Sequence, residues 1–529
     1  MLHTTRAARG MVTAPHHLAS EAGLRVLREG GNAIEATVAV AATLTVVYPH
    51  MNALGGDNFW LIHAPNRPVT AIDACGAAAG KADTDFYKTQ GHDAIPSRGP
   101  LAALTMAGAV SGLERALQDS SQWGGKLPLS RLFEDAIHYA ENGMPAPETL
   151  ARNAAAKSGD LKDVPGWAQV YMPGGNPIGI GEIVKQPRLA ETMRRLCTEG
   201  LDSFYRGDLA RAIAADLARS GSPIDADDLA RHKALDVTPL TLNVRGHTLY
   251  NMPPPTQGLA ALIILGIYDR LGIHQAETAP FVHGLVEATK QAFRIRDAHV
   301  VDPAYMSEPA ESYLDPARLD AMAAEIDAAK AAPWPHPSKQ GDTVWFGAVD
   351  GEGRALSAIQ SIYWEFGSGV ILEDTGITWQ NRGTSFSLDP AHHNALMPHR
   401  RPFHTIQPAL AHLADGRVMP WGTMGGEGQP QTQAMVFARH VLHRMGLQES
   451  VTAPRWLLGR TWGEETTTLK LENRIDGEVI DWLRSAGHAV EMVGDFEEMM
   501  GHAGALVWHP SGLIEGATDP RSDGAAVGF

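Results

Sequence analysis

Cysteine is nearly missing from this sequence. The chain has 529 residues and only 2 cysteines, Cys75 and Cys197, which are too few for a disulfide framework or a four-cysteine metal site. This scarcity suits a reducing compartment, and we therefore expect a cytoplasmic protein.

Positive charge is also scarce. Lys and Arg together number 44 and Asp and Glu number 60, so the formal net charge is −16 at pH 7. Nucleic acids and anionic membranes are both bound through clustered positive charge, so we expect neither as a partner.

Long hydrophobic segments are missing as well. The most apolar long stretch, residues 33–47, contains Glu35 and several threonines, and it is shorter than the roughly 20 residues that a membrane-spanning helix needs. Residues 1–10 carry positive charge but lack the apolar run of an export signal. We therefore expect a protein that neither crosses a membrane nor is exported.

The signatures of common cofactor and metal sites do not occur either. The sequence has no Walker A motif, no His-Glu-x-x-His, no Cys-x-x-Cys and no Gly-x-Ser-x-Gly nucleophile elbow, and no dinucleotide-binding fingerprint stands at a strand-to-helix turn. The adjacent pairs His16–His17 and His392–His393 cannot chelate in the usual way, because neighbouring side chains point in different directions. We expect no metal and no organic cofactor.

The sequence does contain a clear succession of helical and strand-like segments. Gly30–Gly31 is a typical helix end, and Asn32 is a typical cap for the helix that follows. Residues 350–353 form an Asp/Gly-rich turn between two apolar runs, which predicts a β-hairpin. Helices and hairpin-linked strands in one chain indicate packed α and β layers. The predicted helices cover residues 19–28, 33–47, 209–220, 259–271, 317–332, 431–447 and 479–486, and the predicted strands cover residues 59–62, 343–349, 355–363, 505–508 and 512–516.

Residues 333–342 carry the strongest boundary signal in the chain. Prolines and polar residues predict an exposed segment here, and a strand begins directly after it at Thr343. A threonine at the start of a strand is ordinary. It becomes a candidate nucleophile when the chain is cut before it, because the freed α-amine can then act as its general base.

Six segments together resemble the γ-glutamyltransferase family of N-terminal-nucleophile hydrolases. The resemblance implies an α/β fold of the four-layer αββα sandwich type and autocatalytic cleavage between Asp342 and Thr343. It also implies a large subunit of residues 1–342 and a small subunit of residues 343–529, which share one interleaved core as an αβ heterodimer, with a dimer of such heterodimers left open. The six segments are residues 30–36, 252–255, 343, 366–369, 425–426 and 517–521, in the order of the family.

The resemblance also assigns catalytic roles. Thr343 is the expected nucleophile and, once freed, its own base, and acyl transfer passes through an acyl-threonine. Ser361 stands 18 residues later (361 − 343), where the hairpin can bring its hydroxyl beside Thr343; the family commonly has threonine there, and without the family Ser361 is equally well explained as a solvated strand residue. Gly425 and Gly426 leave their backbone N–H groups unobstructed, which suits an oxyanion hole, although alone they indicate only a turn.

The predicted substrate-binding residues depart from the family pattern. The family binds the α-carboxylate and α-ammonium of a γ-glutamyl group with an arginine of the large subunit and with Asn, Gln, Asp and paired Ser of the small one. The carboxylate that would bind an ammonium is lost here, and a guanidinium is gained. At the corresponding positions this sequence has Thr84 for the arginine and Tyr363, Arg382, Ser385 and the pair His404–Thr405 for the small-subunit residues.

This exchange predicts a different substrate. A pocket with Arg382, no anion nearby and the bulky Tyr363 should prefer a short acid without an ammonium group, because a guanidinium binds a carboxylate through two parallel hydrogen bonds. Arg382 could instead pair with a surface Asp or Glu. Residues 361–367 and 379–383 resemble the oxamate amidohydrolase branch of the family. The predicted substrate-binding residues are therefore Tyr363, Asn381, Arg382, His404 and Thr405.

Three functions remain open from the sequence. The first is hydrolysis of a small carboxylate-bearing amide such as oxamate, to oxalate and ammonia. The second is a γ-glutamyl hydrolase or transferase acting on glutathione-like donors, or a cephalosporin-type acylase. The third is an inactive family member kept as a binding or structural protein. The intact Thr343, Ser361 and Gly425–Gly426 favour an enzyme over the third.

Overall fold

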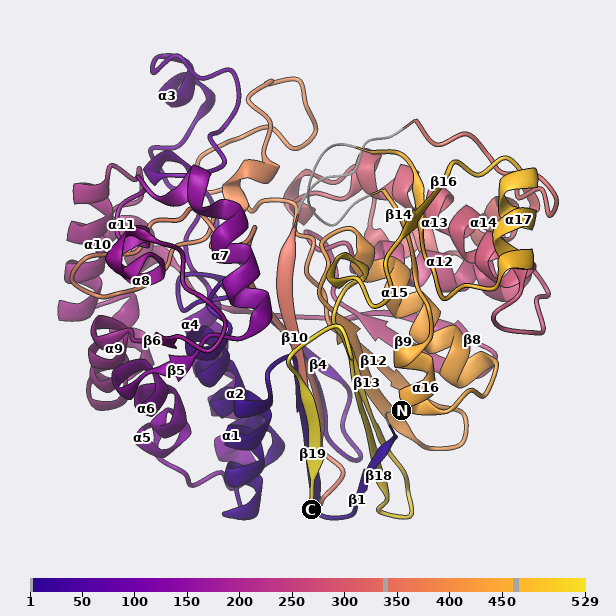
Figure 1. The fold of residues 1–529 in the computed structure, drawn as a ribbon, viewed down its shortest axis with the longest axis horizontal. Helices are drawn as coiled ribbons and strands as arrows, with labels where there is room; N and C mark the ends of the chain where they lie inside the picture. The colour runs from indigo at the N-terminus through magenta and orange to yellow at the C-terminus, as the bar shows by residue number, and fades with distance from the viewer. Residues whose placement is uncertain (1–2, 336–340, 460–465) are drawn as a thin grey trace.

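Two seven-stranded antiparallel sheets form the centre of the molecule (Figure 1). A computed structural model describes residues 3–335, 341–459 and 466–529. The first sheet runs in the order β19 (Ala525–Gly528), β2 (Gly10–Ala14), β10 (Asp342–Asp350), β11 (Ala355–Tyr363), β3 (Asp57–His63), β4 (Thr70–Ala74) and β7 (Leu235–Val237). The second runs in the order β1 (Thr5–Ala7), β18 (Ile514–Thr518), β17 (Ala503–Trp508), β13 (Val418–Thr423), β12 (Ala409–His412), β9 (His247–Asn251) and β8 (Leu240–Val244).

Helices cover the outer face of each sheet, so the molecule has four layers (Figure 1). Beside the first sheet lie α1 (His17–Arg28), α2 (Ala33–Val47) and α4 (Ala109–Gln122), with α5 (Leu129–Leu132), α6 (Glu134–Asn142), α7 (Glu148–Leu161), α8 (Trp167–Tyr171), α9 (Pro187–Glu199), α10 (Asp208–Ser220) and α11 (Ala226–Arg231) further out. Beside the second lie α12 (Gly258–Arg270), α13 (Ala279–His299), α14 (Pro316–Ala324), α15 (Gly428–Phe437), α16 (Leu447–Thr452) and α17 (Gly477–Ser485). Small sheets pair β5 (Met144–Pro145) with β6 (Ile183–Val184), and β14 (Trp456–Leu458) with β15 (Leu469–Glu472) and β16 (Val490–Val493).

The alternation of side chains along β10 shows how the layers are held together. Val344 and Phe346 pack into the core that contains α1 and α2, whereas Trp345 packs into the core between the two sheets. Successive strand residues point to opposite faces, so a strand buried on both sides is apolar throughout. The predicted αββα sandwich is confirmed.

The predicted helix end at Gly30–Gly31 and the predicted helix cap at Asn32 are also confirmed. Gly30 has φ +89 after α1, a backbone conformation that glycine adopts without strain. Asn32 caps α2, and its side chain accepts hydrogen bonds from the backbone N–H groups of Ile34 and Glu35. The Glu35 carboxylate in turn accepts from the Asn32 N–H at 2.9 Å, which completes a capping box.

The predicted hairpin forms from β10 and β11 and carries an irregularity at its open end. Asp342 pairs with Tyr363, but the next pair along the hairpin is Val344 with Gln360, so the register shifts at Thr343. Bulges of this kind redirect side chains and are common beside active sites. Thr343 and Ser361 are thereby brought to the same end of the hairpin, as predicted.

Two segments differ from the prediction. The helix predicted for residues 317–332 ends at Ala324, because backbone carbonyls beyond it are bound by buried side chains of α13: the Asp327 oxygen by His283 Nε2 at 2.9 Å and the Ala332 oxygen by Lys290 Nζ at 2.6 Å. The helix predicted for residues 431–447 begins at Gly428 and continues past Phe437 as a π-helical turn.

The exposed boundary predicted for residues 333–342 is correct only in part. Pro333 and Pro335 are exposed, but Gly341 and Asp342 are buried. Residues 336–340 lie outside the described residues.

A buried network of charges fastens the C-terminal motif, residues 517–521, to the small sheet of β14, β15 and β16. Asp519 Oδ2 lies 2.5 Å from Arg455 Nη2 and Asp519 Oδ1 lies 3.0 Å from Arg521 Nη1. Arg521 also reaches Glu472 through Nη2 at 2.6 Å. All four side chains are fully buried, so each charge depends on its partner. Across residues 3–335, 341–459 and 466–529, no helix is long and apolar enough to cross a bilayer.

Candidate functional site

The peptide bond between Asp342 and Thr343 is surrounded by hydrogen-bonding groups. The Thr343 hydroxyl and the Ser361 hydroxyl each lie 2.5 Å from the Asp342 carbonyl oxygen and donate to it. On the other side of the bond, the Thr343 N–H donates to Asp342 Oδ1 at 2.8 Å. Thr343 and Ser361 are fully buried. Two hydroxyls thus polarise the carbonyl, and the nucleophile candidate already lies against the group that it would attack.

Gln429, in the first turn of α15, fixes the hydroxyl of Thr343. Its Nε2 donates to Thr343 Oγ1 at 3.2 Å. Its Oε1 accepts from the Gln407 N–H at 3.2 Å, which sets the orientation of the amide. Thr343 Oγ1 therefore accepts one hydrogen bond and donates another, which holds it in one rotamer.

Gly425 and Gly426 precede α15 and have left-handed backbone conformations, with φ +117 and +50. A Cβ on Gly426 would lie 2.8 Å from the Gly341 carbonyl oxygen, so the close approach of residue 341 requires glycine here. Gln257 Nε2 donates to the carbonyl oxygens of Gly426 and Thr405, at 2.8 and 2.6 Å. This pair of bonds ties the glycine turn to the segment that carries His404 and Thr405.

Arg382 begins a short 3₁₀ turn, Arg382–Ser385, and its guanidinium is almost completely buried at 1% exposure. Nη1 donates to Thr405 Oγ1 at 3.0 Å. Nε and Nη2 have no hydrogen-bond partner within the described residues. Burial lowers the pKa of Arg382 to about 10, so it stays charged at neutral pH. A buried cation with unsatisfied donors is costly, and it is typical of a binding site for an anion.

Tyr363 forms one wall beside this guanidinium. The Arg382 Cζ atom lies 3.7 Å from the centre of the Tyr363 ring. Tyr363 itself has φ +81, a strained conformation for a residue with a side chain. Its N–H donates to Ser361 Oγ at 2.8 Å, so the turn that positions the ring also positions the Ser361 hydroxyl.

The prediction that no anion lies near Arg382 is wrong. Asp57, at the start of β3, is fully buried, and its charge interacts with that of Arg382. Burial raises the pKa of Asp57 to about 7, against the opposing effects of Arg382 and of hydrogen bonds from Gln380, Gly76 and Gly108. The proximity of Asp57 and Arg382 could not be predicted from the sequence, because the two residues are far apart along the chain.

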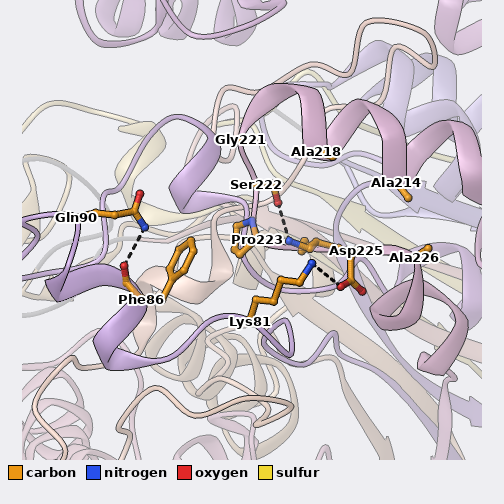
Figure 2. A pocket seen from close by; sticks show the side chains of 11 residues that line it. Lys81, Phe86, Gln90, Ala214, Ala218, Gly221, Ser222, Pro223, Asp225 and Ala226 are labelled. Carbon is orange, nitrogen blue, oxygen red and sulfur yellow. Dashed lines mark hydrogen bonds and ion pairs between the residues drawn. The ribbon is translucent and has the colours of Figure 1, made fainter.

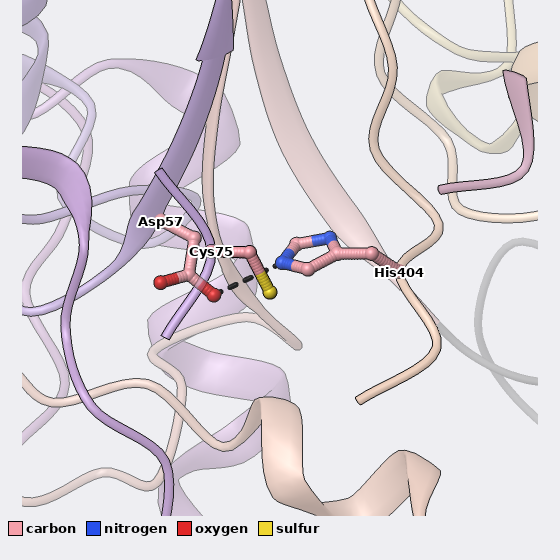
Figure 3. Close-up of side chains that lie close together, drawn as sticks. All are labelled: Asp57, Cys75 and His404. Carbon is pink, nitrogen blue, oxygen red and sulfur yellow. Dashed lines mark hydrogen bonds and ion pairs between the residues drawn. The ribbon is translucent and has the colours of Figure 1, made fainter. Parts of the chain in front are cut away.

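Asp57 is, however, fully engaged. Its Oδ1 accepts from the N–H groups of Gly76 and Gly108 and from Gln380 Nε2, each at 3.0 Å. Its Oδ2 lies 2.9 Å from His404 Nε2 (Figure 3). A carboxylate has room for about four such bonds, so little capacity is left for a further donor.

His404 is held in one orientation by this contact. Burial lowers its pKa well below the usual value, so the ring is neutral, and its Nε2 shares a hydrogen bond with the Asp57 carboxyl group. Nδ1 has no partner in the described parts of the chain. Thr405, the next residue, is bound by Arg382. The predicted pair His404–Thr405 therefore does lie at this site.

Asp57, Cys75 and His404 could in geometry hold a metal ion, since one ligand atom from each lies within 4.8 Å of the others (Figure 3). The electrostatics oppose it. The Arg382 charge lowers the pKa of both Asp57 and His404, so a cation already lies beside the cluster. Burial holds the pKa of the Cys75 thiol well above its usual value, which disfavours the thiolate that a metal needs.

A second such cluster joins α13 to the turn before β16. It contains His283, Glu287 and His488. Lys290 Nζ lies 2.7 Å from Glu287 Oε1 and supplies the positive charge for that carboxylate. This cluster also binds the backbone of Ala332, through Glu287 Oε2 at 3.1 Å and Lys290, so its contacts explain it as a structural clamp.

Asn381 and Arg98 hold the backbone of the turn that follows Tyr363. Asn381 Oδ1 accepts from the Trp364 N–H at 3.1 Å, and Nδ2 donates to the Ser97 carbonyl oxygen at 2.9 Å. Arg98 Nη1 donates to the carbonyl oxygens of Glu365 and Gly367 at 2.6 and 2.5 Å. These side chains bind protein groups, so a direct contact of Asn381 with substrate stays a prediction.

The segment aligned with the family's large-subunit arginine lies at a different place. Thr84 begins α3 (Thr84–Lys88). Lys81 and Phe86 line a cavity of about 410 Å³ in which Lys81 Nζ points to Asp225 Oδ2 at 2.9 Å (Figure 2). This outer cavity is lined by helices and loops of residues 81–226, without any of the predicted catalytic residues.

Gly341 occupies the space between the predicted binding residues. A Cβ added to it would lie 3.0 Å from Gly426 Cα, 3.2 Å from Thr405 Oγ1 and 3.3 Å from the Tyr363 ring. The residue next to Asp342 thus lies against two residues that flank Arg382, Tyr363 and Thr405.

Three functional candidates escaped the sequence reasoning: Asp57, Gln257 and Gln429. The signal for Asp57 was its place directly after Gly55–Gly56 and before an apolar strand, which indicated only a turn. Gln429 follows the glycine pair that the resemblance had marked, so the start of the next helix was the place to look. Gln257 follows the proline segment 253–255 and had no signal of its own.

Comparison with known proteins gives matches over the whole chain. The profile of the family described as "Gamma-glutamyltranspeptidase" matches residues 19–529. An oxamate amidohydrolase proenzyme from Klebsiella pneumoniae subsp. pneumoniae is 54% identical over 521 residues, 98% of each chain. A "Glutathione hydrolase-like YwrD proenzyme" from Bacillus subtilis (strain 168) is 40% identical over 522 residues, 98% of each chain. The crystal structure of a cephalosporin acylase from Bacillus halodurans superposes with a TM-score of 0.91 at 32% identity, and the match covers 100% of this chain and 97% of that one.

Proposed function

Because the chain belongs to the gamma-glutamyltranspeptidase family of N-terminal-nucleophile hydrolases, we propose that it is a self-processing threonine amidohydrolase of a short, carboxylate-bearing amide. Oxamate, hydrolysed to oxalate and ammonia, is the substrate that we favour. The name of the Klebsiella relative supports this choice. The observation that carries it is the buried guanidinium of Arg382, whose Nε and Nη2 lack partners within the described residues.

Processing cuts the chain between Asp342 and Thr343. The cut releases a large fragment of residues 1–342 and a small fragment of residues 343–529, which remain together as an αβ heterodimer. It frees the α-amine of Thr343, whose pKa near 8 suits a general base at neutral pH. It also releases Gly341 from its fixed position against Thr405 and Gly426, so the substrate can enter where residue 341 lay.

The mature site then performs acyl transfer to Thr343. Oγ1 attacks the amide carbonyl carbon of the substrate while its proton passes to the α-amine, and the N–H groups of Gly425 and Gly426 stabilise the oxyanion. The carbon–nitrogen bond breaks as the α-amine returns the proton to the leaving ammonia. Water then attacks the acyl-threonine ester by the same route in reverse. Gln429 keeps Oγ1 aligned throughout.

Arg382 gives the site its preference for a substrate with a carboxylate group. Its free Nε and Nη2 bind the two oxygens of the substrate carboxylate, and Thr405 holds the third nitrogen in place. Tyr363 closes the pocket on one side and limits the length of the substrate. Asp57 balances the Arg382 charge, but its oxygens are already taken by four donors, so an α-ammonium group finds no free carboxylate there.

No metal and no organic cofactor takes part in this reaction. The nucleophile, the base and the oxyanion donors all belong to the chain, and the substrate is a small molecule.

A γ-glutamyl hydrolase is the second candidate, and Asp57 is the observation that favours it. A carboxylate beside Arg382 is the pairing that an amino acid head group would need, and the Bacillus subtilis relative is named glutathione hydrolase-like. This function requires Asp57 to exchange a protein donor, such as His404, for the substrate ammonium. An acylase of the cephalosporin type draws support from the match to the acylase structure.

A panel of substrates separates these functions. Ammonia release is measured with oxamate and glutamine, and product formation with glutathione and a glutaryl amide, each against Thr343→Ala as the inactive control. A kcat/KM for oxamate well above the others supports the proposal. Faster turnover of glutathione or of the glutaryl amide would replace it by the second candidate or by an acylase.

A further inference from the structure

The carboxyl group of Asp342 lies directly against the nitrogen of the peptide bond that would be cut. Asp342 Oδ1 accepts from the Thr343 N–H at 2.8 Å. Its Oδ2 has no hydrogen-bond partner in the described ranges, and the whole residue is 2% exposed. A buried carboxyl oxygen without a partner needs an explanation, because leaving it unsatisfied is costly.

Self-cleavage offers a chemical role for this carboxyl group. When Thr343 Oγ1 adds to the Asp342 carbonyl carbon, the carbonyl oxygen is already served by two hydroxyls, those of Thr343 and Ser361. The other half of the reaction is departure of the nitrogen. An amide nitrogen leaves only when it is protonated, and positioned acids contribute substantially to such steps. The side chain placed at that nitrogen belongs to Asp342.

We propose that Asp342 is the general acid of its own cleavage and gives its carboxyl proton to the departing nitrogen of Thr343. The inference rests on the proposed function, in that it assumes a cut before Thr343. It adds a role to a residue that was expected only to mark the place of the cut.

The steps balance without any group from outside except water. The Oγ1–C bond forms as the hydroxyl proton passes to the Asp342 carbonyl oxygen, which lies 2.5 Å from Oγ1. The carboxyl group turns about its Cβ–Cγ bond, its proton passes from Oδ2 to the nitrogen, and the C–N bond breaks. The new hydroxyl returns its proton to the Asp342 carboxylate as the carbonyl re-forms. The product is an ester of Thr343 with a free α-amine, which water then hydrolyses.

The surroundings keep this carboxyl group in its acid form. Burial, and then the negative charges of Glu365 and Glu498, hold the pKa of Asp342 well above its usual value, while Lys157 opposes them. Glu365 lies in the turn that follows β11, Glu498 begins the short turn Glu498–Met500, and Lys157 lies on α7.

Other groups around the cluster complete the electrostatic picture. Glu365 lies 3.6 Å from Lys157 Nζ and 3.8 Å from Arg98 Nη2, and Glu498 pairs with Arg152. Tyr48, at the end of α2, also senses the charge of Asp342. A raised folded-state pKa extends the acid form of Asp342 to higher pH, and the proton is lost as the pH rises through that pKa. Self-cleavage should therefore slow at high pH.

The test follows the cut in the full chain over time. Precursor is produced at low temperature, and the appearance of the small fragment, with Thr343 confirmed as its first residue by mass spectrometry, is measured for wild type, Asp342→Asn and Asp350→Asn. Asparagine keeps the acceptor for the Thr343 N–H but has no acidic proton, so the rate should fall about 100-fold, at the low end for a lost general acid. Asp350→Asn alters a buried carboxyl at the other end of β10 and should cut at the wild-type rate.

The pH profile supplies a second readout that mere structural damage would not produce. The wild-type rate should fall as the pH rises, and Asp342→Asn should lack that fall. Glu498→Gln removes a negative charge that raises the Asp342 pKa, so the fall should move to lower pH.

Two different failures can be told apart. Asp342→Asn cutting before Thr343 at the wild-type rate with an unchanged profile would overturn the acid role and leave the proposed function standing. A wild-type chain that stays whole while hydrolysing substrate would remove the proposed function itself. If Asp342→Asn does not fold, the wild-type and Glu498→Gln profiles decide, and identical profiles would count against the inference.

Discussion

Replacing Arg382 tests the substrate proposal most directly. The guanidinium is buried at 1% exposure, is fixed by Thr405 through Nη1, and keeps Nε and Nη2 for a ligand. Each hydrogen bond to a charged group contributes about 1.5–3 kcal/mol net, and two parallel bonds to one carboxylate together are worth about 2–4 kcal/mol. At about 1.4 kcal/mol for each factor of ten, Arg382→Ala should lower kcat/KM for oxamate by roughly 30- to 1000-fold.

Arg382→Lys separates charge from geometry. Lysine keeps the positive charge but loses the fork of parallel donors and the planar contact with the Tyr363 ring, which lies 3.7 Å from the guanidinium carbon. Its kcat/KM should therefore fall between wild type and Arg382→Ala. The neutral diamide, oxamide, should lose less activity than oxamate does in either variant, because it has no carboxylate to bind.

A matched control shows whether the effect comes from the site. Arg400 is also buried, its guanidinium carbon lies 4.1 Å from the Tyr305 ring, and it binds the backbone carbonyls of Ala395 and His393. Arg400→Lys should keep the wild-type ratio of oxamate to oxamide turnover, measured as initial rates of ammonia release. If Arg382→Ala hydrolyses oxamate as well as wild type does, the reasoning about a carboxylate anchor is refuted.

Four further outcomes are expected. Thr343→Ala should remain a single chain on a denaturing gel and release no ammonia, and fragments in that variant would contradict the threonine mechanism. Gln429→Leu should slow both cutting and turnover about tenfold, because Thr343 Oγ1 loses a donor worth roughly 1–1.5 kcal/mol; unchanged rates would remove Gln429 from the site. Favourable partners hold the pKa of Asp519 and Glu472 below their usual values, so their stabilisation is present above about pH 4 and is lost as the pH falls further. Melting temperatures should drop in that acid range, and Asp519→Asn should lower the melting temperature at pH 7 and weaken the acid dependence. Incubation with a strong chelator should leave ammonia release unchanged, and activity that returns only on adding a metal would show that a metal is required.

The local features of the fold could be predicted because they depend on neighbouring residues. Asn32 and Glu35 form a capping box within one turn of helix, and the hairpin of β10 and β11 is encoded by two apolar runs and a short turn. The meeting of Thr343 and Ser361 followed from that hairpin. The residues 325–332 continued a helical pattern, but side chains of α13 bind their backbone and end the helix early; that competition is invisible in the pattern itself.

The electrostatics of the site could not be predicted in the same way. Asp57 and Arg382 are 325 positions apart (382 − 57), and their segments meet through the bridge between Gly55 and Trp379 and the bond from Gln380 to Asp57. An inventory of the residues aligned with the family pocket therefore missed the carboxylate. Gln429 was missed for a related reason, since its role depends on how α15 points at the end of β10.

The order of strands in the two sheets has a consequence for how the mature protein comes into being. β2 lies between β19 and β10, and β9 borders β12, so strands from before residue 342 are hydrogen-bonded to strands from after it in both sheets. The sheets can form while the chain is continuous, when loop closure brings these strands together at modest entropic cost. Once the chain is cut, two separate molecules would have to thread strands between one another, and each alone would expose unpaired strand edges that favour aggregation. We therefore expect folding to precede the proposed cut, and we expect heat or denaturant to destroy activity that cooling or dilution does not restore. The durability of the cut form is then set by the rate of unfolding rather than by an equilibrium.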